Sequence, residues 1–254
     1  MGPADTATLT PVFDSPLPAV LVALPGSGSD AYFARQSFAA ACAARGIEFI
    51  AVEPDSSAVV DSYLAALDTA AERGPVLAAG VSLGAAVALD WSGRRPDAAT
   101  GVIAALPAWT GPDTADCPAA LSAATTAAQL RAEGLEPVVE RMRAGSPRWL
   151  AEALTRSWRA HWPLLPAALE EAAQYKWPDA EQLETLPVPM AVITAVDDPV
   201  HPAAVAREWA RRAPRSTLIE ITLDELGADP AVLGHTGLAA FDRRSFGPGG
   251  ADGH

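Results

Sequence analysis

Residues 77–86 read LAAGVSLGAA, an apolar run that reaches a serine between two glycines and continues in helix-forming residues. The pattern Gly80-x-Ser82-x-Gly84 is typical of a nucleophile elbow, a sharp turn from a strand into a helix that exposes the serine hydroxyl. Side chains at the two glycine positions would collide with the turning backbone. We therefore predict a strand over 76–81, a helix over 85–91, and Ser82 as a candidate nucleophile. The competing interpretation is that Ser82 only caps the helix.

Strands and helices alternate on both sides of this stretch, which predicts a mostly parallel sheet flanked by helices, the α/β class. The expected strands are 8–13, 19–24, 47–52, 101–106, 188–194 and 216–223, and the expected helices are 31–45, 58–72, 202–212 and a short one after His235. Between 109 and 186 the pattern is helical without a strand. We predict a core formed by 1–108 and 187–246, a helical cap over 109–186 after the strand that follows the nucleophile helix, and a disordered tail over 247–254.

Composition excludes several classes of function. The chain has 254 residues, half of them hydrophobic, and a formal net charge of −13, so a nucleic-acid or anionic-membrane surface is not expected. No apolar run reaches membrane-spanning length. The two cysteines lie far apart, which favours a reducing, cytoplasmic setting without disulfides. The histidines show no metal-ligand spacing and the glycine-rich loop lacks a nucleotide fingerprint, so we expect no metal and no cofactor.

The loops that follow the expected strands carry the residues suited to catalysis or ligand binding. In open parallel sheets the ligand site lies beyond the carboxyl ends of the strands. The loops after residues 24, 81, 106 and 194, and the loop before the last helix, should therefore line one cleft. The chain order of serine, then aspartate, then histidine is the order expected of a hydrolase with this elbow. A serine needs such partners because its hydroxyl is a poor nucleophile alone.

Four stretches make the sequence resemble an α/β-hydrolase with a helical cap: LPGSGSD at 24–30, GVSLG at 80–84, DDPVHP at 197–202 and LGH at 233–235. The resemblance implies an α/β-hydrolase fold with Ser82 as nucleophile, Asp198 as acid and His235 as base. It further implies an oxyanion hole made by the N–H groups of Ser27 and Leu83, with Gly26, Gly28 and Trp109 beside the substrate. The usual histidine-glycine pair of this loop is Pro25-Gly26 here, so the loop is expected to be held differently.

Several assignments have competitors. Asp197 is the alternative acid, because Asp198 could cap the helix at 202 instead. The other candidate bases are His161 in the cap, His201 in the acid turn and His254 in the tail. Half of the cap tryptophans at 149, 158, 162 and 177 are expected to contact the pocket. The arginines at 141, 143, 148, 156 and 159 most simply form a solvated face, and binding an acidic substrate is the alternative.

The function predicted from these residues is a serine hydrolase that forms an acyl-enzyme on Ser82. Its substrate would be an ester or thioester of a bulky, partly apolar small molecule. The same residues would serve an acyltransferase, a cyclase or a C–C hydrolase, and a catalytically inactive ligand-binding protein is the alternative from another class. An acyl-carrier protein as partner is not favoured, because its acidic surface would meet another acidic surface.

Overall fold

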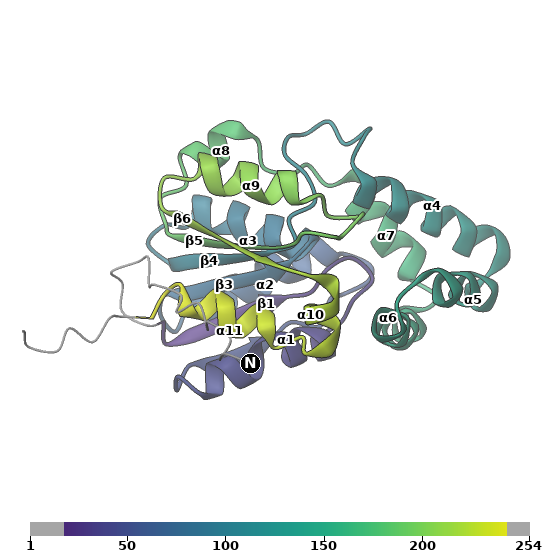
Figure 1. The fold of residues 1–254 in the computed structure, drawn as a ribbon, viewed down its shortest axis with the longest axis horizontal. Helices are drawn as coiled ribbons and strands as arrows, with labels where there is room; N and C mark the ends of the chain where they lie inside the picture. The colour runs from purple at the N-terminus through teal and green to yellow at the C-terminus, as the bar shows by residue number, and fades with distance from the viewer. Residues whose placement is uncertain (1–17, 243–254) are drawn as a thin grey trace, which may run out of the picture.

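The structure is a computed structural model that describes residues 18–242; the strand expected at 8–13 and the tail expected at 247–254 lie outside them. Six parallel strands form one sheet in the order β2-β1-β3-β4-β5-β6 (Figure 1). This confirms the predicted α/β class. The strands are β1 (Val20–Leu24), β2 (Glu48–Ala51), β3 (Val76–Val81), β4 (Ala99–Ala105), β5 (Met190–Ala195) and β6 (Ser216–Ile221).

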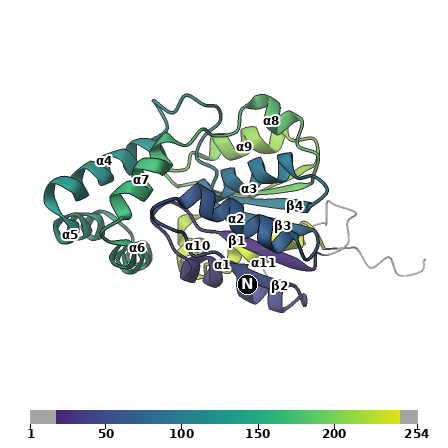
Figure 2. The ribbon, with the colours of Figure 1, turned by 180° about the vertical axis from the view of Figure 1, so that it is seen from behind.

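Helices cover both faces of the sheet, because side chains of the inner strands alternate between two apolar clusters. Val22 packs into the cluster with α2, α3 and α9, whereas Leu21 packs into the cluster with α1 and α11 (Figures 1 and 2). The bounds of these helices are α1 (Ala31–Ala43), α2 (Val59–Ala71), α3 (Leu83–Arg94), α9 (Ala203–Arg212) and α11 (Val232–Ala239), with the short α10 (Leu223–Ala228) before α11.

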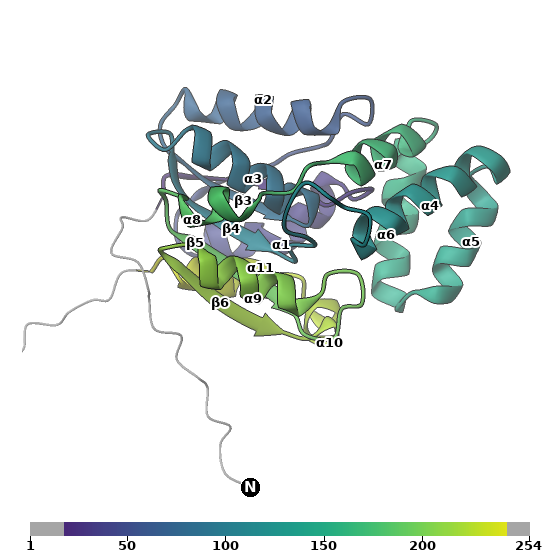
Figure 3. The same cartoon turned by 90° about the horizontal axis from the view of Figure 1, so that it is seen from above.

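The segment between β4 and β5 is helical. It contains α4 (Pro118–Glu133), α5 (Leu135–Gly145), α6 (Arg148–His161), α7 (Leu165–Gln174) and α8 (Ala180–Glu184). Helices α4 to α7 share a small apolar cluster of their own and project beyond one end of the sheet, whereas α8 returns to pack on α9 (Figures 1 and 3). We refer to α4–α7 as the cap. No helix within residues 18–242 is long and apolar enough to cross a membrane.

The strand order places a crevice at the position of the elbow. The chain runs from β1 outward to the edge strand β2 and then returns to β3 on the other side of β1. The connections that leave β1 and β3 therefore diverge, and such a switch point is where open α/β sheets bind ligands. The loop after β1 is the glycine-rich 25–30 segment, and Ser82 directly follows β3.

Candidate active site

Ser82 has the strained backbone expected of a nucleophile elbow. It lies between β3 and α3 with φ 53° and ψ −115°, a region that non-glycine residues rarely adopt. A Cβ at Gly80 would collide with the backbone of Gly84, and one at Gly84 would collide with the carbonyl of Leu24. The turn therefore closes only because both flanking residues are glycine, as the sequence pattern predicts.

His201 connects Ser82 to Asp198. Its Nε2 lies 3.0 Å from the Ser82 Oγ, and its Nδ1 lies 2.8 Å from the Asp198 Oδ2. The side chain of His201 is 16% exposed and that of Asp198 is 8% exposed, so this chain of hydrogen bonds is shielded from solvent. The arrangement gives a serine hydroxyl a base within reach and gives that base a carboxylate that fixes its tautomer.

Asp198 also holds the turn that carries the histidine. Its Oδ1 accepts the backbone N–H groups of Val200 at 2.8 Å and of His201 at 3.2 Å. Burial by itself would raise the pKa of the Asp198 carboxyl, but the hydrogen bond and charge of His201 and the two backbone N–H groups outweigh burial and leave the pKa below its ordinary value. The alternative acid, Asp197, points elsewhere and accepts the N–H of Leu223 at 2.8 Å.

The prediction that His235 faces Ser82 is wrong. His235 lies within α11 rather than in a loop at a strand end, and its side chain is exposed. Helix α11 packs on α1, and a Cβ at Gly234 would lie 2.6 Å from the Ser37 carbonyl oxygen. Because Gly234 faces α1, the next residue faces away from the protein. The position predicted for His235 is occupied by His201, which comes from the same turn as the acid. A histidine three residues after an aspartate in a strand-end loop is the signal that identifies it in the sequence.

The predicted oxyanion residues lie beside the nucleophile. A Cβ on Gly26 would be 3.4 Å from the Cβ of Ser82, so the loop after β1 runs directly against the elbow. Within the described residues, the backbone N–H groups of Ser27 and Leu83 have no hydrogen-bond acceptor. Two free N–H groups next to a serine hydroxyl can stabilise an oxyanion. Gly28 lies farther along the loop, with φ 68°, and its carbonyl contacts the cap.

Pro25, the unusual first residue of this loop, is held by a side chain of α2. The hydroxyl of Tyr63, which is fully buried, donates to the Pro25 carbonyl at 2.9 Å. Burial, with the charges of Glu53 and Glu171, raises the pKa of Tyr63 well above its ordinary value, so the phenol stays a donor. The backbone carbonyl of Pro25 is therefore anchored by a residue that the sequence pattern does not single out.

A pocket of about 720 Å³ lies between the cap and the carboxyl ends of the strands. Ser27, Ser82, Asp198 and His201 form its floor. Its walls are mostly apolar and include Val138, Met142, Trp149, Leu150, Leu154, Trp158, Leu169, Leu223 and Leu226. Arg141 also lines it but is held by Glu133 through two hydrogen bonds of 2.7 and 2.8 Å. The cavity therefore suits an apolar, uncharged group.

Trp109, like Gly28, is not among the residues that line this pocket, contrary to the prediction. Its indole N–H donates to the Asp113 carbonyl, and its own carbonyl accepts from Trp209, so Trp109 closes a loop against α9. Of the four tryptophans predicted for the segment 109–186, those at 149 and 158 line the pocket and those at 162 and 177 do not. Within residues 18–242 no group of three or more acidic, histidine or cysteine side chains could hold a metal ion.

Comparison with solved structures identifies the fold. A hydrolase from Pseudomonas aeruginosa superposes with a TM-score of 0.65 at 17% identity, covering 89% of this chain and 91% of that one. An enol-lactonase from Burkholderia xenovorans gives 0.63 at 15% identity, covering 80% and 83%. A thermophilic esterase from Thermogutta terrifontis gives 0.60 at 19% identity, covering 82% of both chains. The chain has the α/β-hydrolase fold. No protein-family model matches the sequence, and no curated protein matches it significantly.

Proposed function

We propose that the protein is a serine hydrolase in which Ser82, His201 and Asp198 form the catalytic triad. The supporting observation is the unbroken pair of hydrogen bonds from the Ser82 Oγ through the imidazole of His201 to the Asp198 carboxylate. Structures described as an esterase and an enol-lactonase share the fold, which agrees with chemistry at an ester carbonyl.

In the proposed mechanism, the His201 Nε2 accepts the hydroxyl proton as the Ser82 Oγ attacks the acyl carbonyl. The Asp198 carboxylate stabilises the imidazolium through the proton on Nδ1. The N–H groups of Ser27 and Leu83 donate to the oxyanion of the tetrahedral intermediate, each contributing about 3 kcal/mol to barrier lowering. The imidazolium then protonates the leaving alcohol or thiol, and a water molecule activated by His201 releases the acid from Ser82.

The proposed substrate is an ester or thioester of an uncharged, apolar small molecule. The walls of the pocket are largely apolar side chains from α5 and α6, and its one arginine is neutralised by Glu133. A free carboxylate on the substrate would lose its hydration without meeting an unpaired cation. The cytoplasmic location expected from the sequence stays a prediction.

The proposal is tested with p-nitrophenyl esters of increasing acyl length and with a fluorophosphonate probe. We expect saturable hydrolysis, one fluorophosphonate bound on Ser82, and loss of turnover by at least about 10⁴-fold in Ser82→Ala with unchanged folding. Equal labelling of the wild type and Ser82→Ala would refute the nucleophile. Tight ester binding without turnover in the wild type would support the inactive binding protein instead.

A further inference from the structure

Helix α6 of the cap contacts the oxyanion loop, residues 25–30, at three successive residues. The Ser157 hydroxyl donates to the Gly28 carbonyl at 2.6 Å, and the His161 Nε2 lies 3.1 Å from the Ser29 carbonyl oxygen. Arg156 reaches both carboxylate oxygens of Asp30 at 2.8 to 3.1 Å. A cap helix therefore binds the backbone of the loop that carries the proposed oxyanion donor.

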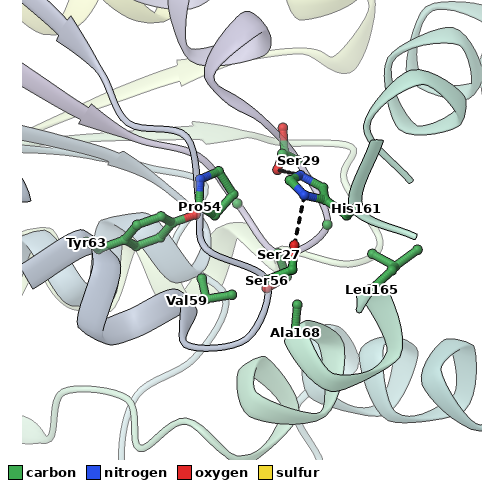
Figure 4. Close-up of a pocket in the computed structure, with 11 residues that line it drawn as sticks. Ser27, Ser29, Pro54, Ser56, Val59, Tyr63, His161, Leu165 and Ala168 are labelled. Carbon is green, nitrogen blue, oxygen red and sulfur yellow. Dashed lines mark hydrogen bonds between the residues drawn. The ribbon is translucent and has the colours of Figure 1, made fainter. Parts of the chain in front are cut away.

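His161 connects this loop to a second one. Its Nδ1 lies 2.8 Å from the Oγ of Ser56, which follows β2, while its Nε2 faces Ser29 (Figure 4). A carbonyl oxygen only accepts, so the Nε2 carries a proton, and in the neutral imidazole the Nδ1 then accepts the hydroxyl proton of Ser56. The nearest acidic group is Glu53, whose Oε1 is 3.8 Å from the Nε2. The His161 side chain is 7% exposed, so these hydrogen bonds have little competition from water.

The planarity of the peptide group transmits these contacts to the Ser27 N–H. The Gly26 carbonyl and the Ser27 N–H belong to one peptide unit and point in opposite directions. That carbonyl accepts the Ser29 N–H at 3.0 Å, so the position of Ser29 sets the direction of the Ser27 N–H. Ser29 is itself held through its carbonyl by His161. The far end of the loop is fixed by Tyr63 at Pro25.

The loop has little room to relax in another direction. Behind it lies a cavity of only about 10 Å³, lined by the loop, Ser56, Tyr63, His161 and α7 residues (Figure 4). This is space for no more than about one water molecule. On the side of α6, a Cβ at Gly28 would lie 2.9 Å from the indole nitrogen of Trp158. The cap and the loop are therefore packed as one unit.

We propose that His161 is a positioning residue that makes the oxyanion hole depend on the docked cap. The inference rests on the proposed serine hydrolase function. With α6 docked, the Ser27 N–H is held beside Ser82. When α6 moves away, Ser29 is released and the Ser27 N–H loses its fixed direction. A substrate that packs against the apolar face of α6 therefore also stabilises the geometry that reacts with it.

The test compares His161→Ala and His161→Gln with Arg159→Ala. Arg159 lies on the same helix but is exposed and pairs with Glu136 on the surface. We expect kcat of His161→Ala to fall about 10- to 100-fold with KM changed less than about threefold, because a misplaced donor costs transition-state rather than ground-state binding. Affinity for a trifluoromethyl ketone, whose adduct with Ser82 carries an oxyanion, should fall by the same factor as kcat/KM.

The conservative variant separates positioning from packing. Glutamine can place an amide N–H near the Ser29 carbonyl, so His161→Gln should recover most of the lost kcat. Arg159→Ala should stay within about twofold of the wild type, as expected for an exposed ion pair. An unchanged kcat in His161→Ala, or a loss that appears only in KM, would overturn the proposal. If His161→Ala fails to fold, Ser157→Ala removes the adjacent contact and must lower kcat in the same way.

Hydrogen exchange makes the outcome independent of the proposed reaction. Backbone amides of residues 26–30 should exchange faster in His161→Ala than in the wild type, and Arg159→Ala should leave them unchanged. If the wild type neither hydrolyses esters nor reacts with fluorophosphonate, the hydrolase proposal fails, and this measurement still tests the contact between α6 and the loop. Unchanged exchange of the amides of residues 26–30 in His161→Ala would refute that contact as the restraint on the loop.

Discussion

Replacing Asp198 with asparagine should inactivate the protein without unfolding it. The two carboxylate oxygens have separate tasks: Oδ1 accepts the N–H groups of Val200 and His201, and Oδ2 accepts from the His201 Nδ1. Asparagine offers only one oxygen. Because two backbone N–H groups need an acceptor and each such bond contributes about 1 kcal/mol, the oxygen should stay at the backbone. The amide NH2 group then faces His201.

That orientation reverses the histidine tautomer. An amide N–H pointing at Nδ1 requires Nδ1 to be unprotonated, so the proton moves to Nε2 and faces the Ser82 hydroxyl. His201 can then no longer accept the serine proton. A tautomer reversed in this way lowers kcat by about 10³- to 10⁴-fold in serine hydrolases, which corresponds to about 4 to 5.5 kcal/mol of barrier. The shape of the side chain is preserved, so the variant should stay folded, with a melting temperature lowered only by the loss of the ionised carboxylate.

The assay is steady-state hydrolysis of p-nitrophenyl butyrate together with the rate of fluorophosphonate inactivation. Asp197→Asn is the matched control, since it makes the same change of charge at the neighbouring residue, whose side chain accepts the Leu223 N–H. This control should keep activity within about threefold, because the amide oxygen can replace that acceptor. If Asp198→Asn retains activity within about tenfold of the wild type, the carboxylate does not orient the base and the reasoning fails.

Three further predictions address the elbow, the pH dependence and the pocket. Gly84→Ala should destabilise the fold by at least about 3 kcal/mol in denaturant unfolding, because its Cβ would collide with the Leu24 carbonyl; a stable variant would contradict the elbow packing. The pKa of Asp198 lies below its ordinary value of 3.8, so the ionised carboxyl stabilises the fold above that pH and the contribution is lost as pH falls through the lowered pKa. The difference in unfolding free energy between the wild type and Asp198→Asn should therefore shrink as the pH falls below about 4; a difference that stays constant from about pH 5 to about pH 3 would contradict it. Leu154→Trp, inside the pocket, should lower kcat/KM for p-nitrophenyl octanoate about tenfold, while kcat/KM for p-nitrophenyl acetate stays within about twofold. Leu121→Trp, on the exposed face of α4, should change neither value.

The core of the fold follows from local patterns in the sequence. Apolar runs bounded by glycine, proline or acidic residues predict the strands, and the limits of β3 at 76 and 81 agree with the structure. Such strands can be recognised in the sequence because a parallel sheet is buried on both faces, so each strand is a continuous run of apolar residues. The elbow can also be recognised in the sequence, because its two glycines stand at a fixed spacing around Ser82. The contact that requires Gly80 is with Gly84, whereas Gly84 is required by the distant carbonyl of Leu24.

The base could not be predicted by analogy with related sequences. His235 has the chain order expected of a hydrolase, but order does not determine whether a residue begins a helix or lies inside one. Gly234 is required for the contact of α11 with α1, and this contact turns His235 toward solvent. In contrast, the DDPVHP turn carries both acid and base, and the Asp198 side chain folds the turn that presents His201.

Contacts between distant segments are the remaining part that the sequence does not reveal. Arg156 belongs to a row of arginines whose spacing indicates a solvated face, and Arg148 and Arg159 do form surface pairs with glutamates. Arg156 instead binds the buried carboxylate of Asp30 and stacks on Tyr32 at 3.8 Å. Nothing local distinguishes it, because its partner lies 126 positions away in the sequence.

The central claim is that His201, and not His235, is the base for Ser82. The most direct measurement is the rate of fluorophosphonate inactivation of His201→Ala and His235→Ala, with kcat/KM for p-nitrophenyl butyrate measured in parallel. We predict a loss of about a thousandfold or more in His201→Ala and a change within about twofold in His235→Ala. An inactive His235→Ala beside a fully active His201→Ala would contradict the account.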